Sequence, residues 1–345
     1  MSLGRSSFVA VLLLGAALGC GDSGSDPVAP DPDPVPGPGA SLPPLAAGDY
    51  VLVLNRESRD VSVLSAAQSY AEVRRLALPD VGAAPAGFDV DPGTGTLYVS
   101  FPNSQTTIVA IGLDGVERAR AQVSGWGPDL AVDAGRGLVV VATGTGVEFL
   151  ASSSLASRAR VQTGTGRTGA WDVTVDPTWG LTLVSNSFDD QVVGISTSDF
   201  RIQTRSAVDA YPRGSAVVEG VAFVAANDAD RLDAVSLADG SLLASIPTGN
   251  GPTSVVADPS RGRVYVANDL SGEISVVDAA TRSELGRWAL HHGLPDIALS
   301  ADGSRLFTCQ PSGALVEIRD AATGAELAEV AVGRSPDVLR AVTLP

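Results

Sequence analysis

The chain has 345 residues and a formal charge of −16, and all 23 of its basic residues are arginine. The lack of lysine excludes Schiff-base enzymes and P-loop nucleotide sites, and the acidic balance argues against nucleic acid as a partner. Two cysteines are too few for a disulfide framework, and one pair of adjacent histidines does not make a multi-histidine metal site.

Residues 1–19 are predicted to be a signal peptide. Arg5 precedes the apolar run 8–18, which as a helix would span only about 16 Å of a bilayer core of ~30 Å. Residues 17–20, Ala-Leu-Gly-Cys, resemble the lipobox of bacterial lipoproteins. That resemblance implies that Cys20 is acylated, that a membrane is a partner, and that the protein lies in the cell envelope, in the periplasm or at the cell surface. The alternative is an ordinary secretory signal with an incidental cysteine.

Residues 20–47 are predicted to be a lipidated cysteine followed by an extended tether. Eight of the 22 prolines and four aspartates lie in 21–47, without a basic residue. Proline removes backbone donors and fixes φ, so neither a helix nor a central strand is expected here. Such a segment would hold the folded part, residues 48–345, away from the membrane surface.

The folded part consists of one repeated unit. A β-type run recurs at steps of 42, 43, 40, 42 and 42 residues, with centres at Tyr98, Val140, Leu183, Phe223, Tyr265 and Phe307. A similar run precedes each of these, and two more follow it. The runs are rich in Val, Ile and Leu and are bounded by Gly, Asp, Asn or Pro, which is typical of short strands.

Four strands in about 42 residues predict an all-β fold, a seven-bladed β-propeller of four-stranded antiparallel blades. The folded part begins at Tyr50 with a second-strand pattern and ends at 337–344 with a first-strand pattern. We therefore expect the C-terminal strand to close the ring by pairing with the N-terminal blade, in a monomeric propeller. An open solenoid of seven repeats is the alternative.

Two of the repeats carry a family resemblance. Residues 251–288 contain YVAND and VVDAATRSEL, and residues 294–333 contain RLFTC and RDAATGAEL. These segments resemble YVTN-type propeller repeats. The resemblance implies seven blades and an extracytoplasmic protein, but no single activity, because a fold does not fix a function.

In such a blade the first strand lines the central channel. The loops that lead into it share one face, here called the loop face, with the loops between second and third strands. Five first strands are predicted to start with aspartate, at Asp89, Asp129, Asp172, Asp296 and Asp337. A ring of carboxylates could hold calcium, with Asp129, Asp172 and Asp296 as the candidate metal ligands. The alternative is structural, because aspartate at a strand start accepts backbone N–H groups.

The same loops carry aromatic side chains and one candidate proton-transfer group. With the five aspartates, the candidate ligand-binding residues are Trp126, Trp171, Tyr211 and His292. Aromatic residues with a polar atom are common at binding surfaces, but they also fill wedges between blades.

Three functions are considered. The first is a non-enzymatic, membrane-tethered scaffold that binds a protein, glycan or small ligand, because no catalytic residue set is visible. The second is a metal-dependent, lactonase-like hydrolase with a divalent cation in the channel. The third, electron transfer with a quinone cofactor, has the least support, since only residues 278–288 suggest a docking motif for it.

Overall fold

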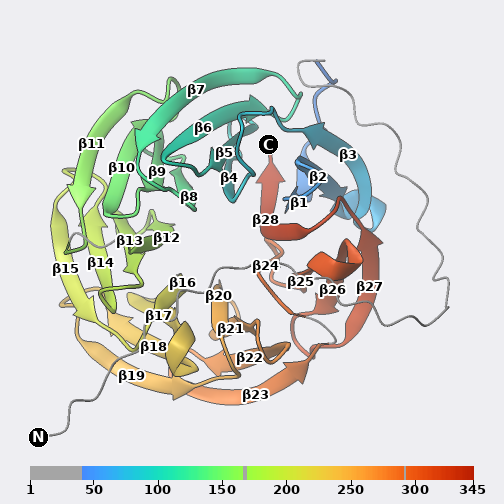
Figure 1. The fold of residues 1–345 in the computed structure, drawn as a ribbon. Helices are drawn as coiled ribbons and strands as arrows, with labels where there is room; N and C mark the ends of the chain where they lie inside the picture. The colour runs from blue at the N-terminus through green and yellow to red at the C-terminus, as the bar shows by residue number, and fades with distance from the viewer. Residues whose placement is uncertain (1–40, 166–168, 291–292) are drawn as a thin grey trace, which may run out of the picture. The chain divides into compact units, whose positions relative to one another are not determined.

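The described strands form seven four-stranded antiparallel sheets arranged around one axis (Figure 1). The computed structural model describes residues 41–165, 169–290 and 293–345. The first strands of neighbouring blades contact one another around the axis, and the fourth strands lie outermost. The predicted fold, an all-β propeller of seven blades, is therefore confirmed.

The first four blades follow the repeat predicted from the sequence. Blade 1 contains β28 (Pro336–Leu344), β1 (Gly48–Asn55), β2 (Asp60–Ser65) and β3 (Ala71–Ala77). Blade 2 contains β4 (Gly87–Asp91), β5 (Thr96–Phe101), β6 (Gln105–Gly112) and β7 (Glu117–Ser124). Blade 3 contains β8 (Leu130–Asp133), β9 (Leu138–Ala142), β10 (Gly146–Ala151) and β11 (Ser157–Gln162). Blade 4 contains β12 (Ala170–Asp176), β13 (Leu181–Asn186), β14 (Gln191–Ser196) and β15 (Ile202–Ala207).

The last three blades have the same order. Blade 5 contains β16 (Pro212–Val218), β17 (Val221–Ala226), β18 (Arg231–Ser236) and β19 (Leu242–Pro247). Blade 6 contains β20 (Pro252–Asp258), β21 (Arg263–Asn268), β22 (Glu273–Asp278) and β23 (Ser283–Ala289). Blade 7 contains β24 (Ile297–Leu299), β25 (Arg305–Gln310), β26 (Leu315–Asp320) and β27 (Glu326–Ala331). The described residues include three short 3₁₀ helices: η1 (Ala66–Gln68) joins the third to the fourth strand of blade 1, whereas η2 (Asn227–Ala229) and η3 (Pro311–Gly313) join second to third strands. Among the described residues, no helix has the length and apolar character needed to cross a bilayer.

The two ends of the folded part close the ring. Strand β28 pairs antiparallel with β1, with Leu344 opposite Gly48 and Val342 opposite Tyr50. Blade 1 is thus built from both ends of the folded part, as the strand count predicts. Closure gives the inner edge of β1 a partner that it would otherwise lack.

Packing between blades makes the core. Leu52 and Leu54 of blade 1 lie in one apolar cluster with Phe88 of blade 2, and Phe307 of blade 7 lies in another with Val51 of blade 1. These side chains are almost fully buried, and each contributes about 1.5–3 kcal/mol relative to full exposure. The second and third strands are buried on both faces, whereas fourth strands such as β7 are mostly exposed. Because packing between blades fixes the strands, the loops of the ring can vary in sequence without disturbing the core.

Candidate functional site

A cavity of about 570 Å³ opens at the loop face, above the central channel. Its lining includes Arg56 and Asp269 from loops between second and third strands, and Trp126 and Pro295 from loops that lead into first strands. The two kinds of loop therefore share one face, as predicted. A second cavity of about 340 Å³ adjoins the first and extends down the channel. Both are lined by Asp129, Asp172, Gly214, Asp296 and Arg340.

Four of the five predicted aspartates lie around the channel, and we call Asp89, Asp129, Asp172 and Asp296 the carboxylate ring. Asp89 accepts the N–H of Val90 at 2.9 Å and that of Val132, in the next blade, at 2.8 Å. Asp129 accepts the N–H of Val173, again in the next blade, at 3.0 Å. These hydrogen bonds link neighbouring first strands, so the structural interpretation of the aspartates has direct support.

The fourth member of the ring makes the most contacts. Asp296 accepts the N–H of Ile297 at 2.9 Å and that of Leu339, in blade 1, at 2.8 Å. The hydroxyl of Ser254, in blade 6, donates to it at 2.5 Å. Asp296 therefore joins three consecutive blades. The fifth predicted residue, Asp337, lies at the mouth instead, with its carboxylate 3.9 Å from Nη1 of Arg56.

Arg340 supplies positive charge to the carboxylate ring. It lies on β28, with Nη1 3.4 Å from Asp296 Oδ2 and Nε 3.6 Å from Asp89 Oδ1. Burial lowers the pKa of Arg340, but the carboxylates of Asp296, Asp89, Asp129 and Asp172 outweigh it and raise that pKa above its ordinary value. The sequence patterns did not predict a role for Arg340. The available signal was that Arg340 is the one charged residue within the mostly apolar segment 338–344.

Burial in the channel raises the pKa of every aspartate in the ring. The pKa of Asp129 rises to about 8, through burial and then through the charge of Asp172, and the pKa of Asp172 rises to about 6. Burial also raises the pKa of Asp89 and Asp296, although Arg340 offsets part of that effect. The raised pKa of Asp129 favours its protonated form, which can donate a hydrogen bond.

The side chains of the carboxylate ring are not arranged as a set of calcium ligands. Among the described residues, no three His, Cys, Asp or Glu side chains come together in a way that could hold a metal ion. Oxygens of Asp129 and Asp296 accept strand N–H groups, and Arg340 already lies against Asp296. The contacts do not favour calcium at Asp129, Asp172 and Asp296, and that site stays a prediction.

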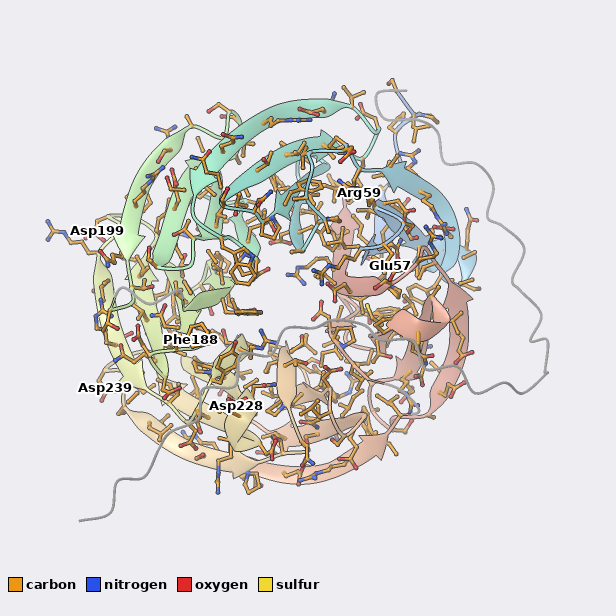
Figure 2. All side chains as sticks on the ribbon, viewed as in Figure 1. Glu57, Arg59, Phe188, Asp199, Asp228 and Asp239 are labelled. Atoms are coloured by element: carbon orange, nitrogen blue, oxygen red, sulfur yellow. The ribbon has the colours of Figure 1, made fainter. Side chains whose placement is uncertain are left out.

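Four aromatic side chains contact one another in sequence over blades 3 to 5, and we call Trp126, Trp171, Tyr211 and Phe188 the aromatic arc. Trp126 and Trp171 line the cavity. Ring centroids are 4.8 Å apart for Trp126 and Trp171, 6.2 Å for Trp171 and Tyr211, and 5.6 Å for Tyr211 and Phe188. Trp126 is 37% exposed and Phe188 is 49% exposed. Figure 2 shows Phe188 on the inner side of blade 4, whereas Asp199 of the same blade lies at the outer edge.

Arg213 lies against the middle of the aromatic arc. Its guanidinium carbon is 4.3 Å from the ring centroid of Trp171 and 5.5 Å from that of Tyr211. Among the described residues, none accepts a hydrogen bond from its buried Nη1 atom. Burial lowers the pKa of Arg213, and Tyr211 and Asp172 partly offset this. A buried guanidinium N–H without an acceptor is costly, so a ligand oxygen at this point would be stabilised.

Tyr211 is held in an unusual backbone conformation. Its φ of 61° is left-handed, which costs an L-residue about 1–2 kcal/mol. The equivalent positions before Pro252 and Pro336 carry Gly251 and Ser335, also with positive φ. Asp190 accepts the Tyr211 N–H at 2.9 Å and helps to fix the turn. An aromatic residue where glycine fits best is consistent with selection for its side chain.

The predicted site residues divide into three groups. Trp126, Trp171 and Tyr211 come together in the aromatic arc, and the aspartates lie in the channel or at its mouth. His292 and Cys20 lie outside the described residues. Arg213 and Phe188 were missed. Arg213 stands in the segment AYPRGS and Phe188 in NSFDD, where neighbouring residues gave stronger signals.

Comparison with known proteins supports the fold alone. No protein-family model matches the chain, and a search of curated proteins finds no match. A structure of a protein of unknown function from Desulfotomaculum acetoxidans is similar, with a TM-score of 0.70, 15% identity, and coverage of 86% of this chain and 99% of that one. A Bacteroides fragilis protein assigned provisionally as a 6-phosphogluconolactonase has a TM-score of 0.67, 14% identity, and coverage of 87% and 99%.

A third similar structure is a hydrazine synthase chain from Kuenenia stuttgartiensis. Its TM-score is 0.68 at 13% identity, with coverage of 79% of this chain and 92% of that one. The neighbours include enzymes and a protein without a known activity. At these identities they show a shared propeller architecture and leave the function to the site itself.

Proposed function

We propose that this protein is a lipid-anchored, extracytoplasmic propeller that binds a protein, glycan or small ligand through its loop face and channel mouth. The observation that carries the proposal is the cavity of about 570 Å³ whose lining includes Trp126 and Trp171 of the aromatic arc. Its volume falls within the range of about 300–1,000 Å³ typical of ligand pockets. Arg213 adds a polar group that points to binding, because its Nη1 lacks an acceptor among the described residues.

A test of this proposal does not need the ligand's identity. Hydroxyl-radical footprinting would compare the oxidation rate of each tryptophan in native envelopes and in the purified full chain. If the loop face is occupied, Trp126 is protected in envelopes, while Trp179, which is 47% exposed and lies in the β12–β13 turn of the opposite face, reacts equally in both. Equal rates for Trp126 in both samples would overturn the proposal.

The anchor is a separate part of the proposal. Its support is the resemblance of residues 17–20 to a lipobox and the Pro- and Asp-rich stretch after it, together with YVTN-like repeats in blades 6 and 7. Acyl chains contribute about 0.8 kcal/mol per buried CH₂, so more than one chain gives a stable anchor. The Cys20→Ser variant is expected to leave the membrane fraction, and a variant that stays there would show that the anchor is elsewhere.

The second candidate is the metal-dependent, lactonase-like hydrolase. The observation in its favour is that the carboxyl groups of Asp129 and Asp172 both line the channel cavity, where a divalent cation would need oxygen ligands. The test is the Tm of the full chain with calcium and with chelator. A rise of several degrees with calcium that disappears in the double variant Asp129→Asn, Asp172→Asn would support this candidate, and no shift would remove it.

A further inference from the structure

We propose that the ligand of the loop-face cavity is a neutral oligosaccharide whose sugar rings stack on the aromatic arc. This inference rests on the proposed function, since it names the ligand class of the same surface. It goes further because it assigns a role to the aromatic side chains, to Arg213 and to the carboxylates that face the cavity.

The first step is the shape and exposure of the aromatic arc. The four rings follow one another at centroid distances of 4.8, 6.2 and 5.6 Å, and Trp126 and Trp171 line the cavity. Trp126 and Phe188, the two ends of the arc, are the most exposed. Neighbouring rings are inclined by 60°, 53° and 82° and so pack edge against face, and Trp126, which is 37% exposed at one end of the arc, offers a surface on which a ring with apolar faces can stack. Sugar rings have such faces, because their C–H groups project on both sides of the ring.

The second step is the charge around the cavity. Its lining contains three arginines, Arg56, Arg213 and Arg340, and five aspartates, Asp129, Asp172, Asp269, Asp296 and Asp337. A strongly anionic ligand would meet the carboxylates, and a strongly cationic ligand would meet the guanidinium groups. A hydroxyl group both donates and accepts, so a neutral ligand with many hydroxyls can use both kinds of side chain without a net charge to compensate. The mixed lining therefore favours a sugar over an ion.

The third step is the position of Arg213. It stacks on Trp171 at 4.3 Å, at the junction of the aromatic arc and the charged lining. Its buried Nη1 has no acceptor among the described residues. A hydroxyl oxygen of a sugar stacked on the arc would supply that acceptor. The guanidinium plane, fixed by the aromatic faces, would then set the orientation of the sugar ring.

A protein partner fits the surface less well. A standard protein interface buries about 800 Å² per partner and has an apolar centre. Here the centre of the loop face is a cavity whose lining includes three arginines and five aspartates, and its aromatic lining is confined to Trp126 and Trp171. A peptide or protein ligand is therefore an outcome of the test and not the proposal.

The test titrates defined probes into the full chain in detergent, by isothermal calorimetry. The probes are neutral oligosaccharides of several linkages, acidic oligosaccharides of matched length, and short peptides. At least one neutral oligosaccharide is expected to bind. Trp126→Ala should weaken it about 30-fold, as expected for an aromatic hot spot, and Arg213→Lys about tenfold, because lysine lacks the planar fork. Trp126 is exposed, so its removal should not disturb folding, which the Tm would verify.

Trp179→Ala is the matched control. Trp179 is also exposed but lies on the opposite face, so this variant should bind the oligosaccharide as the wild type does. Neutral sugar binding that survives Trp126→Ala would overturn the inference. Binding of acidic sugars or peptides alone would overturn it too, but would leave the proposed function standing. If no probe binds and Trp126 is not protected in envelopes, both fail.

Discussion

Charged side chains in the channel have hydrogen-bond or ion-pair partners, whereas one charged side chain at the mouth has a buried donor for which the described residues offer no acceptor. In the channel, Asp89, Asp129 and Asp296 accept N–H groups of neighbouring strands, and Arg340 lies among them. At the mouth, Arg213 stacks on the partly buried ring of Trp171, and its buried Nη1 has no acceptor among the described residues. A concentration of charge alone therefore does not identify a binding site in a propeller. The useful signs are exposed aromatic surface and a buried donor that lacks an acceptor.

The largest expected effect is on stability, from Arg340→Leu. This change would leave four carboxyl groups close together without the guanidinium that faces them. We expect the free energy of unfolding to fall by about 2–4 kcal/mol. This is less than the loss typical of a fully buried ion pair, because the Arg340 side chain is 30% exposed. Chemical denaturation of the full chain measures it. Arg201→Leu is the control, because Arg201 is 81% exposed and its nearest carboxylate is 3.9 Å away. Equal losses in the two variants would remove the distinction between channel and surface.

The next largest effect is expected on ligand affinity, from a substitution that fills part of the loop-face cavity. Ala84 is exposed and lines the cavity, so Ala84→Trp should occupy part of the ligand volume with little change in Tm. We expect affinity for the bound oligosaccharide to fall by more than about tenfold. Ala280→Trp is the control, since Ala280 is exposed in the β22–β23 turn of the opposite face. Unchanged affinity in Ala84→Trp would place the ligand elsewhere.

A smaller effect concerns pH. Burial raises the pKa of Asp129 to about 8 in the folded chain, from an ordinary value near ~3.9 in the unfolded chain, so the folded state retains a proton that the unfolded state releases. The stability from this group is fully present below about pH 4 and is lost as the pH rises toward 8. We expect Tm to fall between pH 5 and 8.5, and Asp129→Asn, which imitates the protonated carboxyl, to raise Tm at pH 8.5 by about 2–4 °C.

Asp302 provides the contrast for that experiment. Hydrogen bonds from Ser300 and Ser304 lower its pKa to about 2, so its contribution to stability is lost only below about pH 4. Asp302→Asn should therefore lower Tm by a similar amount at pH 5 and at pH 8.5. If Asp129→Asn has the same flat profile, the channel carboxyl does not hold a proton at neutral pH.

The fold was predictable from the sequence because each blade repeats the same local pattern. Steps near 42 residues and the first-strand pattern at 337–344 were enough to predict seven blades and closure through β28 and β1. The gathering of Asp129, Asp172 and Asp296 around the channel was predictable for the same reason, since equivalent positions of the repeats meet at the axis.

The partners of those residues were not predictable, because they break the repeat. Arg340 and Arg213 each occupy a first strand in which the equivalent residues of other blades are not basic. Only the closed ring shows that Arg340 reaches Asp89 and Asp296, which belong to blades 2 and 7. Phe188 comes from a loop between second and third strands, and its contact with Tyr211 depends on the three-dimensional turn before β16. Non-repeated residues of this kind need the structure.

The most direct test of the division between channel and mouth is the Tyr211→Gly variant, with affinity for the neutral oligosaccharide and unfolding measured on the same sample. Glycine relieves the left-handed φ of 61°, which offsets the packing lost with the ring, so the free energy of unfolding should change by less than about 1 kcal/mol. Affinity should fall about tenfold or more, because the ring lies in the middle of the aromatic arc. Unchanged affinity with a clear loss of stability would contradict the account, since the aromatic arc would then serve packing alone.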